Sequence, residues 1–187
     1  MFRHFKEKLT VGRGLSERIW IYQAKRGNRE AFGKLYEKHI DGIYRYLYFR
    51  LNQDRFTAED LVQTVFFKAW ENITKFAGGN FSAWLFSIAH NQLIDYYKKA
   101  KAIVYLQTEV EDRKENLEER VIQNDKLERL KKAIGSLTDE QKAVITLRFI
   151  EGLNHRLVGQ ILKKEERAVR AIQYRALKQL RKILEEG

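Results

Sequence analysis

Apolar side chains recur at intervals of three and four residues along most of this chain, the spacing that lines one face of an α-helix. No proline interrupts the pattern anywhere in the 187 residues, and a proline inside a helix would break it. Charged residues make up 33 % of the chain and supply the solvated faces that amphipathic helices need. The sequence therefore predicts an all-α protein.

The segment 57–101 holds two apolar stripes, one on each side of the glycine pair Gly78 and Gly79. Adjacent glycines are typical of a tight turn, so we expect one helix before the pair and one after it. A short helix over 17–25 and a long helix that Asn28 caps precede this segment. Because the connections are short, the sequence predicts a four-helix bundle over 16–101. The two stripes consist of Leu61, Val62, Val65, Phe66, Ala69, Trp70 and Ile73, and of Phe81, Trp84, Leu85, Ile88, Ala89 and Leu93.

The composition changes after this bundle. Residues 107–126 include seven acidic and four basic residues and very few apolar ones. We interpret residues 102–126 as a charged, net acidic linker. Four more helices are expected over 127–187, one of which begins at a capping box formed by Thr138 and Gln141. With a basic arm over 1–15, the prediction is two small helical domains joined by a charged linker.

The net charge of the chain is +11, which favours a polyanionic partner: nucleic acid first, an anionic membrane surface second. The chain has no cysteine, and its four histidines are scattered, so we expect no disulfide, metal or other cofactor. Charges interrupt the N-terminal segment where a signal peptide needs an apolar run, and no stretch is apolar enough for a membrane span. We expect a cytoplasmic protein without membrane insertion.

The last two predicted helices, over 154–162 and 167–185, have the layout of a helix-turn-helix. Gly159 is small where the two helices must approach closely, and Lys163 and Lys164 stand where the turn requires a positive φ. A basic face on the second helix would fit the major groove, where arginine can donate two hydrogen bonds to guanine. This face consists of Arg167, Arg170, Tyr174, Lys178 and Arg181.

Two parts of the chain resemble a known family. The strings AEDLVQTVFFKAW and NFSAWLFSIAHNQLIDYYKK resemble region two of bacterial RNA polymerase sigma factors, and the segment that begins LTDEQKAVITLRF is similar to their region four. The likeness covers residues 28–101 and 127–184. With no segment between them but the acidic linker, the order resembles the extracytoplasmic-function (ECF) type, which lacks region three.

The resemblance implies three sets of contacts. It implies that one helix face binds the clamp helices of the largest polymerase subunit, although Thr64 stands where the family usually has Glu. It also implies capture of the non-template strand of the −10 element and recognition of the −35 element. Among the departures, Leu157 replaces a charged residue and Glu165 replaces a capping Ser or Thr. The expected residues are Asp60, Gln63, Thr64 and Phe67 for polymerase; Phe76, Asn80, Trp84, Asn91, Asp95, Lys98, Lys99 and Lys101 for −10; and Arg167, Arg170, Gln173, Tyr174, Lys178 and Arg181 for −35.

The first hypothesis is therefore a promoter-specificity subunit that is not an enzyme. Its implied partners are core RNA polymerase, through the clamp helices and the flap region, promoter DNA and an anti-sigma factor, and we expect a monomer when it is free. The second hypothesis is a stand-alone helix-turn-helix regulator with an N-terminal dimerisation or ligand bundle. A third, a nuclease, would need clustered carboxylates or histidine ligands. Glu59 and Asp60 are adjacent but point in different directions on a helix, and no histidine joins them.

Overall fold

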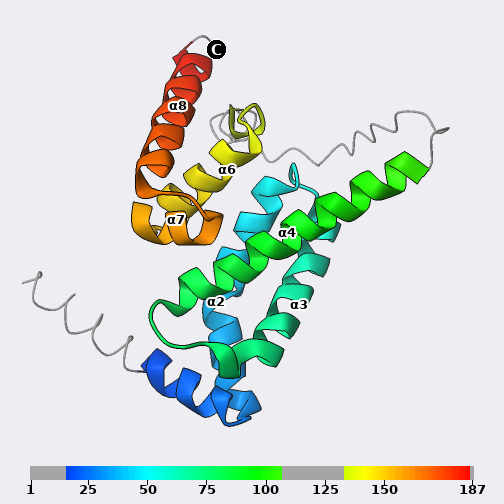
Figure 1. Ribbon diagram of the computed structural model, residues 1–187, viewed down its shortest axis with the longest axis vertical. Coiled ribbons are helices and arrows are strands. Elements are labelled where there is room, and N and C mark those ends of the chain that lie inside the picture. The colour runs from blue at the N-terminus through cyan, green and yellow to red at the C-terminus, as the bar shows by residue number, and fades with distance from the viewer. Residues whose placement is uncertain (1–15, 107–132, 186–187) are drawn as a thin grey trace, which may run out of the picture.

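The computed structural model of the protein describes residues 16–106 and 133–185, and every regular element within those ranges is helical (Figure 1). The predicted all-α class is confirmed. A short helix spans residues 16–25. The elements that follow are α2 (Arg29–Arg50), α3 (Arg55–Asn72), the 3-10 turn η1 (Ile73–Lys75), α4 (Phe81–Leu106), α6 (Asp139–Ile145), the π-helical turn η2 (Thr146–Ile150), α7 (His155–Leu162) and α8 (Glu166–Glu185).

Side-chain caps fix where several of these helices begin. The predicted capping box is confirmed, since Thr138 and Gln141 exchange hydrogen bonds at the start of α6. Asn28 caps α2, as predicted. The start of α3 was predicted wrongly at Thr57: its cap is Asp54, whose carboxylate accepts hydrogen bonds from the backbone N–H of Thr57 at 3.1 Å and from its hydroxyl at 2.5 Å. The helix therefore starts at Arg55, two residues earlier.

The N-terminal helices α2, α3 and α4 pack against one another around an apolar core (Figure 1). Aromatic side chains join them in edge-to-face pairs, which favour such contacts beyond simple burial. Phe32 of α2 lies against Trp70 of α3 with ring centroids 5.0 Å apart, and Tyr46 of α2 lies against Phe86 of α4 at 5.6 Å. These contacts hold α3 and α4 side by side, which creates the groove described below.

The N-terminal and C-terminal helices also pack together, which the sequence did not lead us to expect. Helix α4 lies against α7, and α2 lies against α6 and η2 (Figure 1). A single cluster of buried apolar residues runs from Ile43 and Leu47 of α2 to Leu147 of η2 and Val158 of α7. The predicted domain boundary at 101 falls inside α4, which continues to Leu106. The arm, residues 107–126 of the linker, and all but the end of the predicted helix near 127–134 lie outside the described residues.

The helix-turn-helix forms as predicted, from α7, a short turn and α8. Gly159 is essential to it, because a Cβ at this position would lie 2.6 Å from the carbonyl oxygen of Lys164. The residue in the left-handed conformation is Lys163, with φ 54° and ψ 46°, and its N–H donates to the carbonyl of Gly159. Upstream, the predicted single helix over 138–150 is divided, since α6 changes to the π-helical turn η2 at Thr146.

Candidate nucleic-acid and polymerase interfaces

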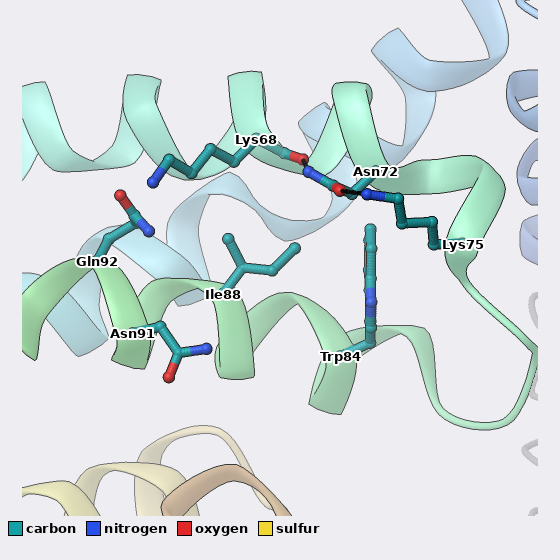
Figure 2. A pocket seen from close by; sticks show the side chains of 7 residues that line it. All are labelled: Lys68, Asn72, Lys75, Trp84, Ile88, Asn91 and Gln92. Atoms are coloured by element: carbon teal, nitrogen blue, oxygen red, sulfur yellow. Dashed lines mark hydrogen bonds between the residues drawn. The ribbon is translucent and has the colours of Figure 1, made fainter. Parts of the chain in front are cut away.

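A pocket of about 300 Å³ lies between the end of α3 and the first half of α4 (Figure 2). Its walls combine an aromatic ring and an aliphatic side chain with amides and two ammonium groups. Figure 2 shows the Trp84 ring standing between the two helices, with Ile88 beside it and Asn91 and Gln92 one turn further along α4. This is the mixture of surfaces that holds an unstacked base and its phosphate. The lining residues are Lys68, Asn72, Lys75, Trp84, Ile88, Asn91 and Gln92.

Hydrogen bonds fix one side of this pocket. The Asn72 amide nitrogen donates to the carbonyl oxygen of Lys68 at 2.8 Å, and its oxygen accepts from Nζ of Lys75 at 2.8 Å (Figure 2). Asn72 therefore shapes the wall and holds the Lys75 ammonium at the rim. Across the pocket, Asn91 is exposed while Gln92 is buried, so Asn91 has the amide that is more accessible to a ligand.

An aromatic cluster supports Trp84 from behind. The ring of Phe76 lies 5.4 Å from those of both Phe81 and Trp84. Phe76 is only 6 % exposed, so it does not present a face to DNA as the sequence led us to expect. Its buried ring is therefore a packing residue. The backbone carbonyl of Phe76 accepts a hydrogen bond from Lys25 Nζ at 2.8 Å, which ties the loop to the first helix.

The conformation of the turn before α4 depends on a pair of glycines and on the asparagine that follows them. Gly78 and Gly79 have φ values of 106° and 91°, which are accessible to glycine and strained for other residues. Asn80 then caps the helix, with its side-chain oxygen accepting from the N–H of Ala83 at 2.7 Å. Asn80 was expected to contact DNA; in the structure its oxygen positions the start of α4. Further along α4, the other expected −10 residues continue from Asn91 as exposed side chains: Asp95, Lys98, Lys99 and Lys101.

A second surface lies on the outer face of α3. Asp60 and Gln63 are exposed there, flanked by the exposed rings of Phe56 and Phe67, at 75 % and 62 %. Positions 56, 60, 63 and 67 are spaced by four, three and four residues, so they share one face of the helix. Thr64 lies beside this face, half-buried, and its hydroxyl donates back to the carbonyl of Asp60 at 3.1 Å.

A third surface is the outer face of α8. Five of the six residues expected there are exposed, and three of the arginines are held by carboxylates of the same helix or its preceding turn. Arg170 contacts Glu166 at 2.6 Å, and Arg167 contacts Glu165 at 3.2 Å. The glutamates near the start of α8 thus orient the guanidinium groups before any ligand arrives. The five exposed residues are Arg167, Arg170, Tyr174, Lys178 and Arg181.

Gln173 lies on a different side of α8. Its amide oxygen accepts from Nε of Arg148 at 3.1 Å and lies 2.9 Å from Nε2 of His155. Arg148 also donates to the carbonyl of Leu153. Gln173 therefore joins η2, α7 and α8, and its hydrogen bonds orient α8 on the rest of the domain.

Neither a membrane span nor a metal site is found in the part of the chain that the structure describes. No described helix is both long and apolar enough to cross a bilayer. Within the same residues, no three His, Cys, Asp or Glu side chains gather in a way that would hold a metal ion.

Comparison with known proteins finds two family models along the chain. The family model "Sigma-70 region 2" matches residues 35–103, and "Sigma-70, region 4" matches residues 133–182. SigW of Bacillus subtilis is 31 % identical over 180 residues, which cover 89 % of this chain and 95 % of SigW. This chain belongs to the sigma-70 family of RNA polymerase sigma factors, as an ECF-type member.

Other relatives agree with this assignment. The ECF sigma factor SigX of Bacillus subtilis is 30 % identical over 83 % of this chain and 84 % of SigX. BldN of Streptomyces coelicolor is 34 % identical over 88 % of this chain, but the match spans only 64 % of BldN. Sigma factors direct RNA polymerase to promoters, and the two matched regions bind core polymerase and promoter DNA.

Solved structures of sigma factors share the fold. CnrH, in complex with the cytosolic domain of CnrY, superposes with a TM-score of 0.70 at 25 % identity over 92 % of this chain and 99 % of CnrH. RpoE of Bartonella quintana, in complex with the anti-sigma factor NepR, gives a TM-score of 0.72 at 23 % identity over 82 % of this chain and 96 % of RpoE. The region 2 match falls on α2, α3 and α4, and the region 4 match on α6 to α8.

Several residues that lie on the outer face of α3 or line the α3–α4 pocket were not predicted from the sequence. Phe56 was missed because α3 was expected to start one residue after it. Lys68 and Lys75 were missed because α3 was divided into only a core face and an outer face, whereas its end has a third face toward α4. The seven-residue spacing of the two lysines, two helical turns, was the signal that could have revealed it.

Proposed function

We propose that this sigma factor captures the non-template strand of the −10 element in the groove between α3 and α4. The pocket that Trp84 and Asn91 share with Lys68 and Lys75 is the observation that carries the proposal. A flipped base gains a stacking surface from Trp84 and a hydrogen-bonding partner from the Asn91 amide. The two ammonium groups at the rim neutralise the adjacent phosphates.

This groove favours promoter melting because its ligand is unpaired. A base inside a duplex cannot reach the Trp84 ring, whereas a flipped base can. Binding energy for the single strand is therefore available only after the base pair opens, which shifts the equilibrium toward the open form. The basic residues that follow Asn91 on α4 extend the contact along the backbone. The sigma factor contributes binding alone, and the polymerase performs the bond-forming chemistry.

Region 4 recognises the −35 element through the outer face of α8. A helix fits the major groove, where Arg167 or Arg170 can donate two parallel hydrogen bonds to guanine and Lys178 can contact a phosphate. The Glu165 and Glu166 carboxylates orient these arginines and also reduce their net charge. Gln173 positions α8 through Arg148 and His155 instead of contacting a base.

Core polymerase docks on the outer face of α3. Asp60 and Gln63 provide polar contacts at its centre, and Phe56 and Phe67 provide apolar contacts three helical turns apart. Aromatic side chains are enriched at protein interfaces, so two exposed rings on one helix face are consistent with a docking surface. We place the protein in the cytoplasm with its polymerase, as a monomer when free. An anti-sigma factor is proposed as a further partner, because CnrH and RpoE are found in complexes with CnrY and with an anti-sigma factor.

One reconstitution tests this function. The purified protein is mixed with core polymerase and a library of promoter fragments, and co-elution and initiation are measured. The expected result is a complex with core polymerase that initiates on a subset of fragments. Tight binding to a duplex palindrome by a homodimer that ignores core polymerase would instead support a stand-alone helix-turn-helix regulator and exclude the proposal.

A further inference from the structure

The first helix, over residues 16–25, precedes the segment that the region 2 family model matches, which begins at residue 35. One side of this helix packs on the N-terminal core. Ala24 is only 1 % exposed, and Trp20 lies partly buried against the same apolar cluster. The helix is therefore a fixed part of the N-terminal bundle, although it lies outside the matched segment.

A paired carboxylate fixes the beginning of the first helix. Oε1 of Glu17 lies 2.6 Å from Nε2 of His39, and its Oε2 lies 2.9 Å from Nζ of Lys38, both on α2. The His39 ring also lies 5.5 Å from the ring of Phe81, the first residue of α4. The first helix cannot slide along α2 without breaking these contacts.

The last residue of the first helix bonds to the loop before α4. Nζ of Lys25 donates to the backbone carbonyl of Phe76 at 2.8 Å, across 51 residues of sequence. In Figure 1 the first helix lies next to the loop between η1 and α4, where this bond forms. A hydrogen bond from a charged donor is stronger than one between neutral groups. Lys25 therefore connects a fixed helix to the residue at which the loop begins.

The loop itself consists of residues with much backbone freedom. Gly78 and Gly79 adopt φ values of 106° and 91°, and glycine reaches many other conformations as readily. A Cβ built at either glycine would meet no atom within 4 Å, so the neighbouring structure does not confine this part of the loop. A bond to the carbonyl of Phe76 therefore restricts the loop at the end where its freedom begins.

The wall of the α3–α4 pocket rests on Phe76. The ring of Phe76 lies 5.4 Å from the ring of Trp84, and Phe81 lies 5.3 Å from Trp84 on the same side of the cluster. A displacement of Phe76 would remove a support of the Trp84 ring. A site that is already in its bound conformation binds more tightly, because the ligand supplies no free energy for ordering it. The position of Phe76 therefore affects the affinity of the pocket.

We propose that Lys25 is a positioning residue for the −10 pocket: its bond to the Phe76 carbonyl holds the loop so that the Trp84 ring is in place before the strand arrives. The inference rests on the proposed function, because it takes this pocket as the −10 site. Lys25 acts through the loop and does not touch DNA. Without the bond, some molecules hold the loop in other conformations, and the apparent affinity falls in proportion to the fraction that remains competent.

Three full-length variants test this role. Lys25→Met removes the ammonium group and keeps an unbranched side chain, whereas Lys25→Arg keeps a charged donor. The matched control is Lys34→Met, which removes the same charge from an exposed lysine of α2 that pairs with Glu30. We expect Lys25→Met to bind a single-stranded −10 oligonucleotide about tenfold more weakly than the wild type. The other two variants should bind like the wild type, and all three should retain its affinity for a −35 duplex.

The salt dependence distinguishes positioning from direct contact with DNA. Loss of a phosphate contact would reduce the slope of log K against log salt by about 0.7. We expect Lys25→Met to keep the slope of the wild type, because the molecules that bind still make all their contacts. A reduced slope, or an affinity equal to that of the wild type, would overturn the proposal. Weaker binding to the −35 duplex as well would indicate a general loss of folded protein and would also overturn it.

A double-mutant cycle tests whether Lys25 acts through Trp84. Trp84→Leu removes the stacking surface and keeps an apolar side chain against Phe76. In this background we expect Lys25→Met to weaken binding by at most about twofold, since residues that act through one another are not additive. A further tenfold loss would contradict the proposed route.

Hydrogen exchange provides a measurement without DNA. The amides of Gly78 and Gly79 should exchange faster in Lys25→Met than in the wild type or in Lys34→Met, because the loop opens more often. Equal exchange rates in all three proteins would contradict the role of Lys25. Failure of the wild-type protein to bind the −10 strand would instead refute the proposed function, so the two failures are distinguishable.

Discussion

The phenol oxygen of Tyr46 lies 2.9 Å from Nδ1 of His90, which joins α2 to α4 beside the contact with region 4. Tyr46 is fully buried, and burial raises its pKa to about 12. Burial, together with the positive charges of Arg50 and Lys163, lowers the pKa of His90 to about 4. His90 is therefore neutral at physiological pH, and in the tautomer protonated at Nε2 its Nδ1 accepts the hydrogen bond from the Tyr46 hydroxyl.

This relationship predicts a loss of stability in mild acid. The pKa of His90 is lower in the folded protein than in the unfolded chain, where it is about 6.5. Between these values the unfolded chain binds more protons, so the free energy of unfolding falls as the pH decreases from about 6.5 to about 4. Denaturant unfolding measured at several pH values checks this. His90→Asn keeps an acceptor for Tyr46 and removes the titration, so its stability should fall less steeply over the same range; an identical slope would exclude His90 as the cause.

Phe56 should contribute to polymerase binding. The ring is 75 % exposed on the face that also holds Asp60 and Gln63, so Phe56→Ser should leave the fold intact. We expect the variant to bind core polymerase about tenfold more weakly, a loss of about 1.4 kcal/mol, in fluorescence anisotropy titrations. Tyr22→Ser removes another exposed aromatic ring, at 61 %, from the first helix and should bind normally. Equal affinities for the two variants would remove Phe56 from the interface.

The two kinds of contact in the α3–α4 pocket should differ in their salt dependence. Lys75→Gln removes one phosphate contact, so the slope of log K against log salt for a single-stranded −10 oligonucleotide should decrease by about 0.7. Asn91→Ala removes a base contact, so its affinity should fall at every salt concentration while the slope stays that of the wild type. Filter binding or anisotropy at several salt concentrations distinguishes these results. Identical slopes for Lys75→Gln and the wild type would place the phosphate elsewhere.

The turn of the helix-turn-helix should respond to two substitutions with opposite signs. Lys163 adopts a left-handed conformation that costs a side-chain-bearing residue about 1 kcal/mol, so Lys163→Gly should raise the free energy of unfolding by up to that amount. Gly159→Ala places a methyl group 2.6 Å from the backbone oxygen of Lys164 and should lower it by about 1–3 kcal/mol. Thermal unfolding followed by circular dichroism measures both. Destabilisation by Lys163→Gly would show that the lysine side chain, not its backbone conformation, governs the turn.

The features that could be predicted from the sequence are those that depend on local spacing. The all-α class, the capping box at Thr138 and the helix-turn-helix follow from periodicity and from residue types with strong positional preferences. The exposed basic face of α8 follows from the same periodicity, because residues opposite a buried stripe are solvated.

The features that could not be predicted depend on distant partners. Gln173 has the same side chain whether it faces DNA or Arg148, and only the placement of Arg148 and His155 beside it decides between them. Phe76 looks like an exposed loop aromatic until Phe81 and Trp84 are placed beside it. The contact between α2 and η2 joins residues that are separated by most of the chain, so no local pattern indicates it.

Helix α8 divides its residues between two tasks that do not overlap. Val169, Ile172, Ala176 and Leu180 are buried and hold it in the domain, while the basic side chains on its opposite face are exposed. Substitutions on the outer face are therefore expected to change promoter preference with little penalty in stability. After gene duplication, selection can re-target such a helix one residue at a time while every intermediate still folds. Because the buried residues of α8 hold the helix in place, the DNA specificity of its exposed face can change readily during evolution.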